Sequence, residues 1–181
     1  MNWKSPTETG WSVRIAADLS SVAIFDPATI VRAELFPAEG DEFIAHFGRL
    51  KRETIAERID RFGPALTKGK LATLRFPDGT AVSVSDEKRH GMRRRNKLCE
   101  VAVAGRHYRF EHSSGRKAAA RRDGIELARY VRARGLRAIE VSRKSLSATD
   151  DIDECVLTLF QKVILPGREG AFGEIMSALS I

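Results

Sequence analysis

The sequence lacks several features that would point directly to a class of protein. Its 181 residues include only two cysteines, Cys99 and Cys155, which lie far apart inside apolar patterns and predict buried free thiols in a reducing compartment. No apolar run approaches the roughly 20 residues that span a bilayer, and the polar first ten residues lack the apolar core of a signal peptide. These absences predict a cytoplasmic globular protein, and its basic charge is compatible with a peripheral position at a membrane.

Motifs for catalysis or metal binding are also missing. The stretch Gly63 to Lys70 looks like a phosphate loop, but five residues separate its glycines where the nucleotide motif has four, and Leu71 stands where a hydroxyl would hold magnesium. No serine lies in a G-x-S-x-G elbow. The histidines have no zinc spacing, since His107 and His112 are five apart on an expected strand and point to opposite faces. We therefore predict no catalytic residue, no metal and no cofactor; whether the chain is an enzyme stays open, with the balance against it.

The strongest positive signal is an apolar helix near the end of the chain, over residues 150–165. Thr149 or Asp150 can cap its N-terminus, and the acidic residues that follow suit a helix N-terminus better than a calcium loop. Pro166-Gly167 ends it. Its apolar residues recur at helical spacing: Ile152, Val156, Leu159, Phe160, Val163 and Ile164. A stripe this wide requires a concave apolar partner.

The chain before this helix is typical of short strands joined by tight turns. Expected strands cover 11–17, 21–25, 30–36, 71–76, 80–85, 98–103, 106–111, 117–122, 125–132 and 136–143. Turn signals at 77–79, 104–105 and 123–124 join three consecutive hairpins. Between residues 41 and 66 the apolar spacing becomes helical and predicts one or two helices. The fold class expected is α+β, mainly antiparallel β, with a curled meander or barrel packed on the late apolar helix.

We expect a single domain over residues 1–181. Within it, residues 1–10 form a flexible N-terminal tail, 41–66 a helical insertion and 150–180 the C-terminal helices. The expected core includes Val101, Val103, Tyr108, Phe110, Val156, Leu159, Phe160 and Val163.

Three stretches in the second half of the chain carry a resemblance to a known group of proteins. They are VAVAGRHYRF at 101–110, AAARRDGIELA at 118–128 and the helix from Asp150 onward. Their order, hairpins followed by a late apolar helix, resembles the tubby-like superfamily, which includes the LURP-one-related proteins and the phospholipid scramblases. The resemblance implies a closed antiparallel barrel around the helix and binding of phosphoinositides. The chain departs from that pattern in two places. Residues 41–66 are predicted to be helical, and the chain continues beyond the late helix. No binding residue of the superfamily maps onto a position of this sequence.

A basic run lies between two of the expected strands. Residues 88–97 read KRHGMRRRNK, in a chain whose formal net charge is +7. Guanidinium groups bind phosphate bidentately, so the run predicts contact with an anionic partner. A solvated loop that keeps the protein soluble is the alternative interpretation. The candidate ligand-binding residues are Lys88, Arg89, Arg93, Arg94, Arg95 and Lys97.

A second set of basic residues is spread over the hairpins that follow. These residues could extend the basic surface of the run 88–97, or they could be the polar outward positions of a barrel. They are Arg116, Lys117, Arg121, Arg122, Arg129, Arg132, Arg134, Arg137, Arg143 and Lys144. Few aromatic residues interleave with these charges, which favours phosphate contact over stacking on single-stranded nucleic acid.

The sequence therefore predicts a non-enzymatic binding module with a basic face for anionic ligands, most readily phosphoinositide or acidic lipid headgroups. One alternative is a nucleic-acid-associated protein that uses the same face. Another is a protein-partner adaptor whose contact surface includes Trp3, Trp11 and a terminal helix.

Overall fold

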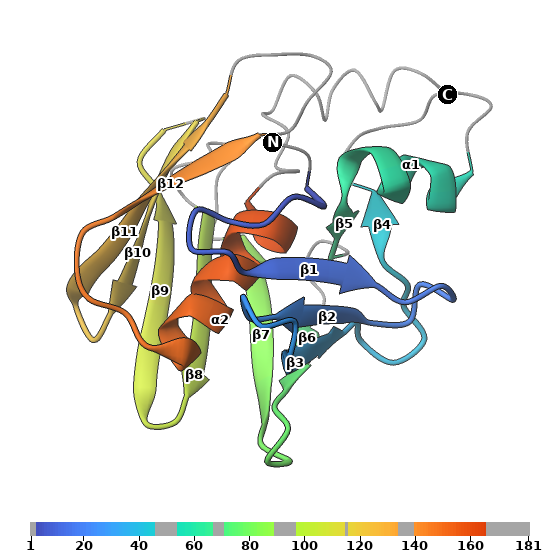
Figure 1. Cartoon of the computed structure of the whole chain (residues 1–181), viewed down its shortest axis with the longest axis horizontal. Helices are drawn as coiled ribbons and strands as arrows, with labels where there is room; N and C mark the ends of the chain where they lie inside the picture. Colours follow the sequence, from blue (N-terminus) through green and yellow to red (C-terminus); the bar gives the residue numbers. More distant parts are fainter. Residues whose placement is uncertain are drawn as a thin grey trace.

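In the computed structural model, ten strands form an antiparallel sheet that curls around one helix (Figure 1). The structure describes residues 3–45, 54–66, 71–88, 97–114, 116–133 and 140–165, with the backbone alone for 85–88 and 97–98. The strands of this sheet are β1 (Ser12–Ile15), β2 (Val22–Phe25), β3 (Val31–Phe36), β6 (Leu71–Arg75), β7 (Ala81–Lys88), β8 (Lys97–Val103), β9 (Arg106–His112), β10 (Lys117–Arg122), β11 (Ile125–Arg132) and β12 (Val141–Ser145). A two-stranded sheet pairs β4 (Ile44–Ala45) with β5 (Pro64–Ala65), and the helices are α1 (Ile55–Phe62), α2 (Asp151–Leu159) and the π-helical turn η2 (Phe160–Ile164).

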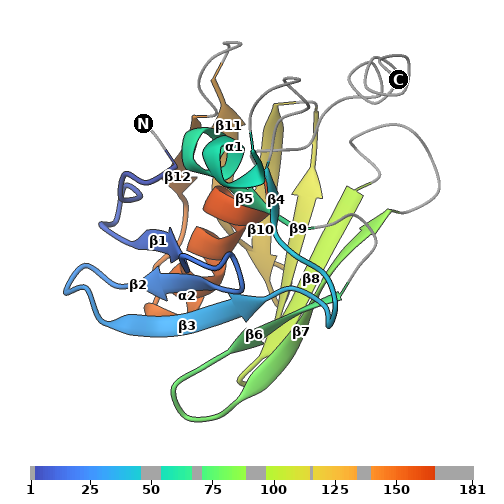
Figure 2. The ribbon, with the colours of Figure 1, turned by 90° about the vertical axis from the view of Figure 1, so that its right-hand side faces the viewer.

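The large sheet is a meander in which every strand pairs with its predecessor in the order β1-β2-β3-β6-β7-β8-β9-β10-β11-β12. Its tight turns follow from local chemistry. Ala104-Gly105 and Asp123-Gly124 have positive φ at both positions, as a two-residue turn between twisted antiparallel strands requires. The predicted fold class is thereby confirmed: the fold is mainly antiparallel β, with a late helix in the concavity of the sheet (Figure 2).

Helix α2 begins at a capping box. The Asp150 carboxylate accepts the Asp153 N–H at 3.0 Å, and the Asp153 carboxylate accepts the Asp150 N–H at 3.1 Å. Asp150, rather than Thr149, is therefore the N-cap. These acidic residues satisfy the helix N-terminus and its dipole, in agreement with the interpretation of the sequence.

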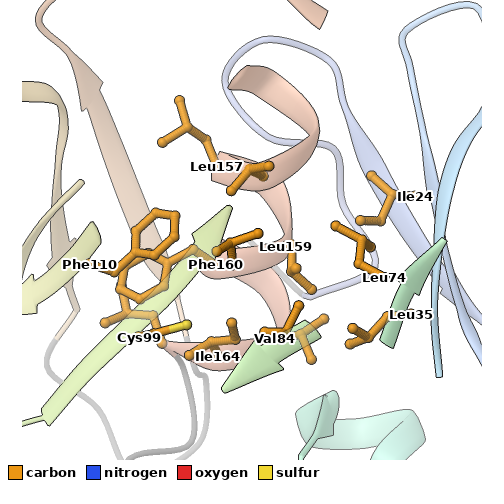
Figure 3. Close-up of a cluster of buried hydrophobic side chains, with 14 of the residues drawn as sticks. Ile24, Leu35, Leu74, Val84, Cys99, Phe110, Leu157, Leu159, Phe160 and Ile164 are labelled. Carbon is orange, nitrogen blue, oxygen red and sulfur yellow. The ribbon is translucent and has the colours of Figure 1, made fainter. Parts of the chain in front are cut away.

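The core lies between α2 and both halves of the curled sheet. In Figure 3, Leu159 lies toward Leu74 on one side of the helix, while Phe160 faces Phe110 on the other. The Phe160 ring stacks on Phe110 with 4.1 Å between centroids and meets Tyr130 edge-on at 5.2 Å. All residues predicted for the core are buried: Val101, Val103, Tyr108, Phe110, Val156, Leu159, Phe160 and Val163.

The last turn of the helix widens to π geometry, with the Leu165 N–H donating to the Phe160 C=O at 2.9 Å. All five residues of η2 are buried, including Gln161 and Lys162. Lys162 Nζ donates to the C=O of Ser5 at 2.8 Å, and burial lowers the pKa of Lys162. The polar residues of this turn thus serve to hold the N-terminal segment.

Residues 3–10 pack against the rest of the molecule, which corrects the expectation of a flexible tail at 1–10. Trp3 and Thr7 are buried, and the Trp3 indole N–H donates to the C=O of Asp60 at 2.9 Å. Glu8 accepts the N–H of Arg143 at 2.7 Å. The segment therefore lies between the two margins of the sheet, β1 and β12, where those strands do not pair with each other. Trp3 and Trp11 are both buried, so neither forms an exposed apolar patch, and the adaptor alternative stays a prediction.

The segment 41–66 is only partly the helical insertion that was predicted. Helix α1 forms over 55–62 behind a capping box of Thr54 and Glu57 and ends before Gly63, whose φ is +90°. Ile44–Ala45, however, pairs with Pro64–Ala65 as a strand. Apolar spacing over so few residues does not distinguish helix from strand. Residues 46–53 lie outside the described residues.

Other predicted boundaries also differ from the structure, and the strand expected at 80–85 continues to Lys88 as β7. The last strand was expected at 136–143, but β12 covers 141–145, and 134–139 lie outside the described residues. The first strand is shorter than 11–17, since β1 covers 12–15. The terminal helix expected beyond Gly167 also lies outside the described residues.

Candidate anion-binding end of the sheet

Three connections between neighbouring strands begin and end at one end of the sheet. Lys88, the last residue of β7, is the register partner of Lys97, the first residue of β8. β9 ends beside the start of β10, and β11 ends beside the start of β12. We use the name basic end for this end of the sheet together with the three sequence segments that connect its strands, 88–97, 113–117 and 132–140, of which residues 89–96, 115 and 134–139 lie outside the described residues.

The basic end accounts for the whole positive charge excess of the chain. Its three segments contain eleven Lys or Arg residues and a single acidic residue, Glu140, which is a net charge of +10. The complete chain has a formal net charge of +7, so all other residues together have a net charge of −3. Sequence order alone does not show this asymmetry, because the strand pairing is what brings the three segments to the same end.

Two of these cations have described side chains with no acidic partner. Arg116 and Lys117 are exposed at the start of β10, and neither makes an ion pair with any described residue. Arg132, at the end of β11, donates its backbone N–H to the C=O of Arg116 at 2.9 Å, which places two basic residues on adjacent strands. Arg116 and Lys117 are therefore the described side chains of this end that an anion could neutralise.

Farther along the same strands the arginines are compensated. Arg109 and Arg121 both pair with Glu111, at 2.6 and 2.7 Å, and Arg129 pairs with Glu126 at 2.5 Å. This outer network is partly exposed and alternates in sign across three strands. The second basic set of the sequence is thus not one continuous cationic face.

Two more arginines of that set neutralise buried carboxylates. Arg143 Nη2 lies 2.6 Å from Glu154, and both side chains are almost fully buried. Arg122 pairs with Asp153, a fully buried carboxylate that also accepts the Tyr108 hydroxyl at 2.7 Å. Burial, followed by the hydrogen bond to Asp153, raises the pKa of Tyr108. Arg143 is thus fully buried, whereas Arg122 remains partly exposed while its guanidinium pairs with Asp153.

The predicted ligand-binding residues fall partly outside the described residues. Lys88 and Lys97 are placed by their backbones at the two strand ends that face each other. Arg89, Arg93, Arg94 and Arg95 belong to the connection between them and lie outside the described residues. The prediction that the run joins two strands is confirmed at both of its ends, whereas ligand binding stays a prediction.

The other described residues that the sequence offered for chemistry are two cysteines and two histidines. Cys99 and Cys155 are free and buried, and burial raises the pKa of each thiol to about 12, so neither is a ready nucleophile at neutral pH. His107 is exposed and His112 buried, on opposite faces of β9 as predicted. Within the described ranges no group of three His, Cys, Asp or Glu side chains is placed to hold a metal ion.

Sequence reasoning missed a cavity on another side of the molecule. It has a volume of about 630 Å³ and lies between β1, the segment 3–10 and α1. Its walls are more apolar than polar, with Trp3, Val13 and Ile59 among them, and they also include two ion-paired acidic residues, Asp26 and Asp60. No local signal marks it in the sequence, because its three sides come together only in the folded chain.

No protein-family model, curated protein or solved structure matches the chain. Among the described residues, no helix has both the length and the apolar character needed to cross a membrane.

Proposed function

We propose that this protein is a non-enzymatic binding module whose basic end docks on anionic ligands, most readily the headgroups of phosphoinositides or other acidic lipids at a cytoplasmic membrane surface. The observation that supports this most directly is the concentration of a net charge of +10 in three segments at one end of the sheet. The resemblance of the hairpins and late helix to tubby-like domains points to the same class of ligand.

The chemistry of the basic end suits phosphate in particular. Eight of its eleven cations are not lysine but arginine, whose planar guanidinium donates two parallel hydrogen bonds to phosphate oxygens. The flanking strands are held by β pairing and by the core, so that residues at their ends are presented from a rigid support. Multiple cations near an anionic membrane contribute about 1 kcal/mol each.

Liposome co-sedimentation at physiological salt tests the proposal. Wild-type protein should sediment with vesicles that contain phosphatidylinositol bisphosphate and less with neutral vesicles. The triple variant Arg93→Ser, Arg94→Ser, Arg95→Ser should lose most of that binding. Absence of vesicle binding by the wild type would reject the lipid proposal.

A matched control separates local charge from net charge. The triple variant Arg109→Ser, Arg121→Ser, Arg129→Ser removes the same three charges from the compensated outer network. If the basic end is the docking surface, this control should bind vesicles almost as well as wild type. Equal losses in both triple variants would show a response to overall charge alone.

Nucleic acid is the second candidate ligand, because a cluster of arginines without interleaved aromatic residues also suits phosphate backbones. A gel shift with duplex DNA and with RNA distinguishes the two. Retardation that falls steeply with salt, with no preference among lipid headgroups, would replace the lipid proposal by this one.

A further inference from the structure

Strand β1 has an open margin. It lies at the end of the strand order and pairs with β2 alone among the described strands. In an antiparallel pair, alternate residues bond to the partner, and the residues between them direct N–H and C=O to the opposite side. The Ala16 N–H donates to the C=O of Ser21 at 2.9 Å, which fixes this alternation. Arg14 therefore bonds to β2, whereas Val13 and Ile15 direct their backbone groups outward.

The other margin of the sheet shows how this fold satisfies such outward groups. On β12, the C=O of Val141 accepts from Gln161 Nε2 at 2.9 Å. The N–H of Arg143 donates to Glu8 Oε1 at 2.7 Å. Side chains thus cap this margin and block the addition of another strand.

The margin of β1 is capped only at its start. Thr7 donates its N–H to the C=O of Trp11 at 2.6 Å, and its hydroxyl accepts the Trp11 N–H at 3.2 Å. Beyond Trp11 the cover stops. Within the described part of the chain, the outward N–H and C=O groups of Val13 and Ile15 have no hydrogen-bond partner. Unpaired backbone groups of a residue as buried as Val13, which is 2% exposed, are costly unless a partner supplies the bonds.

The cavity runs along this same margin. Consecutive residues 12–17 line it on one side, and Trp3, Pro6, Ala56 and Ile59 line it on the others. We call this cavity the β1 groove. An apolar groove beside two residues with unpaired backbone groups is the combination that recognises an extended peptide, since main-chain bonds provide affinity and the walls accept alternate side chains.

We propose that the β1 groove binds an extended peptide segment of a partner protein, which adds to the sheet as a strand beside β1. Trp3 and, from α1, Ala56 and Ile59 line the groove opposite the residues of β1, so the occupant that we infer is one extended segment between them. A second copy would bring its own Trp3 and α1 along with its β1, so that the same groove residues of the two copies would meet each other.

The surroundings define the kind of peptide that fits. Side chains directed toward Val13 and Ile59 meet apolar walls, so alternate positions should be apolar. The intervening positions lie on the outer face beside Arg14, which is exposed, stacks over Phe25 at 4.7 Å and has no acidic partner among the described residues. An acidic residue opposite Arg14 would make a favourable cross-strand pair. This site is separate from the basic end and does not depend on the proposed function.

A random library of peptides of roughly eight residues, displayed on phage, tests the proposal with the full chain as bait. Ala56→Trp places a large ring in the groove from an exposed helix position and serves as the counter-selection bait. Ala102→Trp makes the same change on the exposed face of β8 and is the matched control. Peptides enriched on wild type should alternate apolar and polar residues and include an acidic one. Their affinity by fluorescence anisotropy should fall at least about tenfold for Ala56→Trp and stay unchanged for Ala102→Trp.

Backbone methylation distinguishes strand addition from simple apolar contact. Methyl groups on the alternate amides that face β1 should abolish binding, whereas methylation of the other set should leave it intact. Equal effects of the two sets would overturn the proposal. So would a library with no enrichment over Ala56→Trp, or wild-type protein that self-associates through β1.

Discussion

At the scale of single residues, the interior contains charges that apolar packing alone would not tolerate. Arg143 and Glu154 form a buried pair, and Thr9 donates its hydroxyl hydrogen to the same Glu154 oxygen that Arg143 contacts. Arg143 Nε and Nη1 have no hydrogen-bond partner in the described structure. Because the guanidinium is only partly hydrogen-bonded, the free energy of unfolding depends strongly on its ion pair with the Glu154 carboxylate.

Glu154→Gln should therefore destabilise the protein by about 3–5 kcal/mol, since it leaves the Arg143 charge buried without its counter-ion. Urea denaturation at pH 7 measures the loss. The double variant Arg143→Met, Glu154→Leu should be more stable than Glu154→Gln, because it removes both charges. A double variant at least as unstable as Glu154→Gln would contradict this account.

Phe160→Ala should cost about 3–5 kcal/mol, because the ring that stacks on Phe110 and meets Tyr130 is removed from a closely packed core. Phe160→Leu should cost less, since it leaves a smaller cavity. Thermal melts of both variants provide the comparison, and an Ala variant that melts with the wild type would disprove the central position of this ring.

Asp26 gives the fold a defined response to acid. Its carboxylate accepts the Ile30 N–H and then the Arg32 guanidinium, and these bonds lower its pKa below the usual 3.8. The folded state therefore binds its proton less readily than the unfolded state. This contribution to stability is complete above pH 3.8 and is lost as the pH falls through the lower folded pKa. Asp26→Asn should lose less unfolding free energy than wild type between pH 5 and pH 2, as measured by urea titrations. Parallel pH profiles of the unfolding free energy for the variant and the wild type would contradict this prediction.

At the scale of elements, the segment 3–10 takes the place of a strand pair. It joins the start of β1 through Thr7, the margin of β12 through Glu8 and the helix through Thr9. Beside β12 and at the start of β1, hydrogen bonds from a segment without regular structure thus replace those that a neighbouring strand would make.

Glu8→Ala should loosen the margin of β12 selectively. The Arg143 amide loses its acceptor, so its hydrogen exchange should accelerate, while the Ala128 amide within β11 should exchange as before. Exchange measured by NMR tests this expectation. Equal acceleration at both amides would indicate general destabilisation instead.

The same elements show how far sequence reasoning reached. Hairpin turns and the late helix were predictable because Ala104-Gly105, Asp123-Gly124 and the apolar stripe are local signals. The ordered packing of residues 3–10 was not predictable, because it depends on contacts with Arg143 and Gln161, which are more than a hundred positions away in the sequence. The neutralisation of the Arg121 charge by acidic residues was also not predictable from the sequence. A register shift after Ala120 places Arg121 opposite Glu126, and no local sequence pattern indicates such a shift. For the candidate site, the sequence predicted the run 88–97 between strands, but the convergence of three basic segments required the strand pairing.

At the scale of the whole molecule, charge is separated along the strands. The opposite end from the basic end carries Asp78 and Asp123 in its turns and the acidic N-terminus of α2, which Arg106 contacts through Asp150 at 2.6 Å. Such a separation orients the protein as it approaches an anionic surface.

Vesicle binding should consequently weaken as the salt concentration is raised from about 0.05 to 0.5 M, because salt screens the attraction between the cations of the basic end and the anionic vesicle surface. Sedimentation across that series, with the triple variant of Arg109, Arg121 and Arg129 as reference, measures the effect. Binding that is indifferent to salt would indicate apolar insertion rather than electrostatic docking.

The position of α2 in the chain has a consequence for how the protein is made. The concave wall of the sheet comes from residues 12–145, and the helix that fills it in the described part of the chain, α2 with η2, follows at 151–164. A ribosome that adds about 5–20 residues per second therefore exposes ten strands of apolar wall before their core exists. Side chains such as Ile24, Leu35 and Leu74 lack part of their packing partners until the helix that contains Leu159 and Phe160 has been synthesised (Figure 3). Nascent chains of this protein should accordingly require chaperone protection until the helix has emerged.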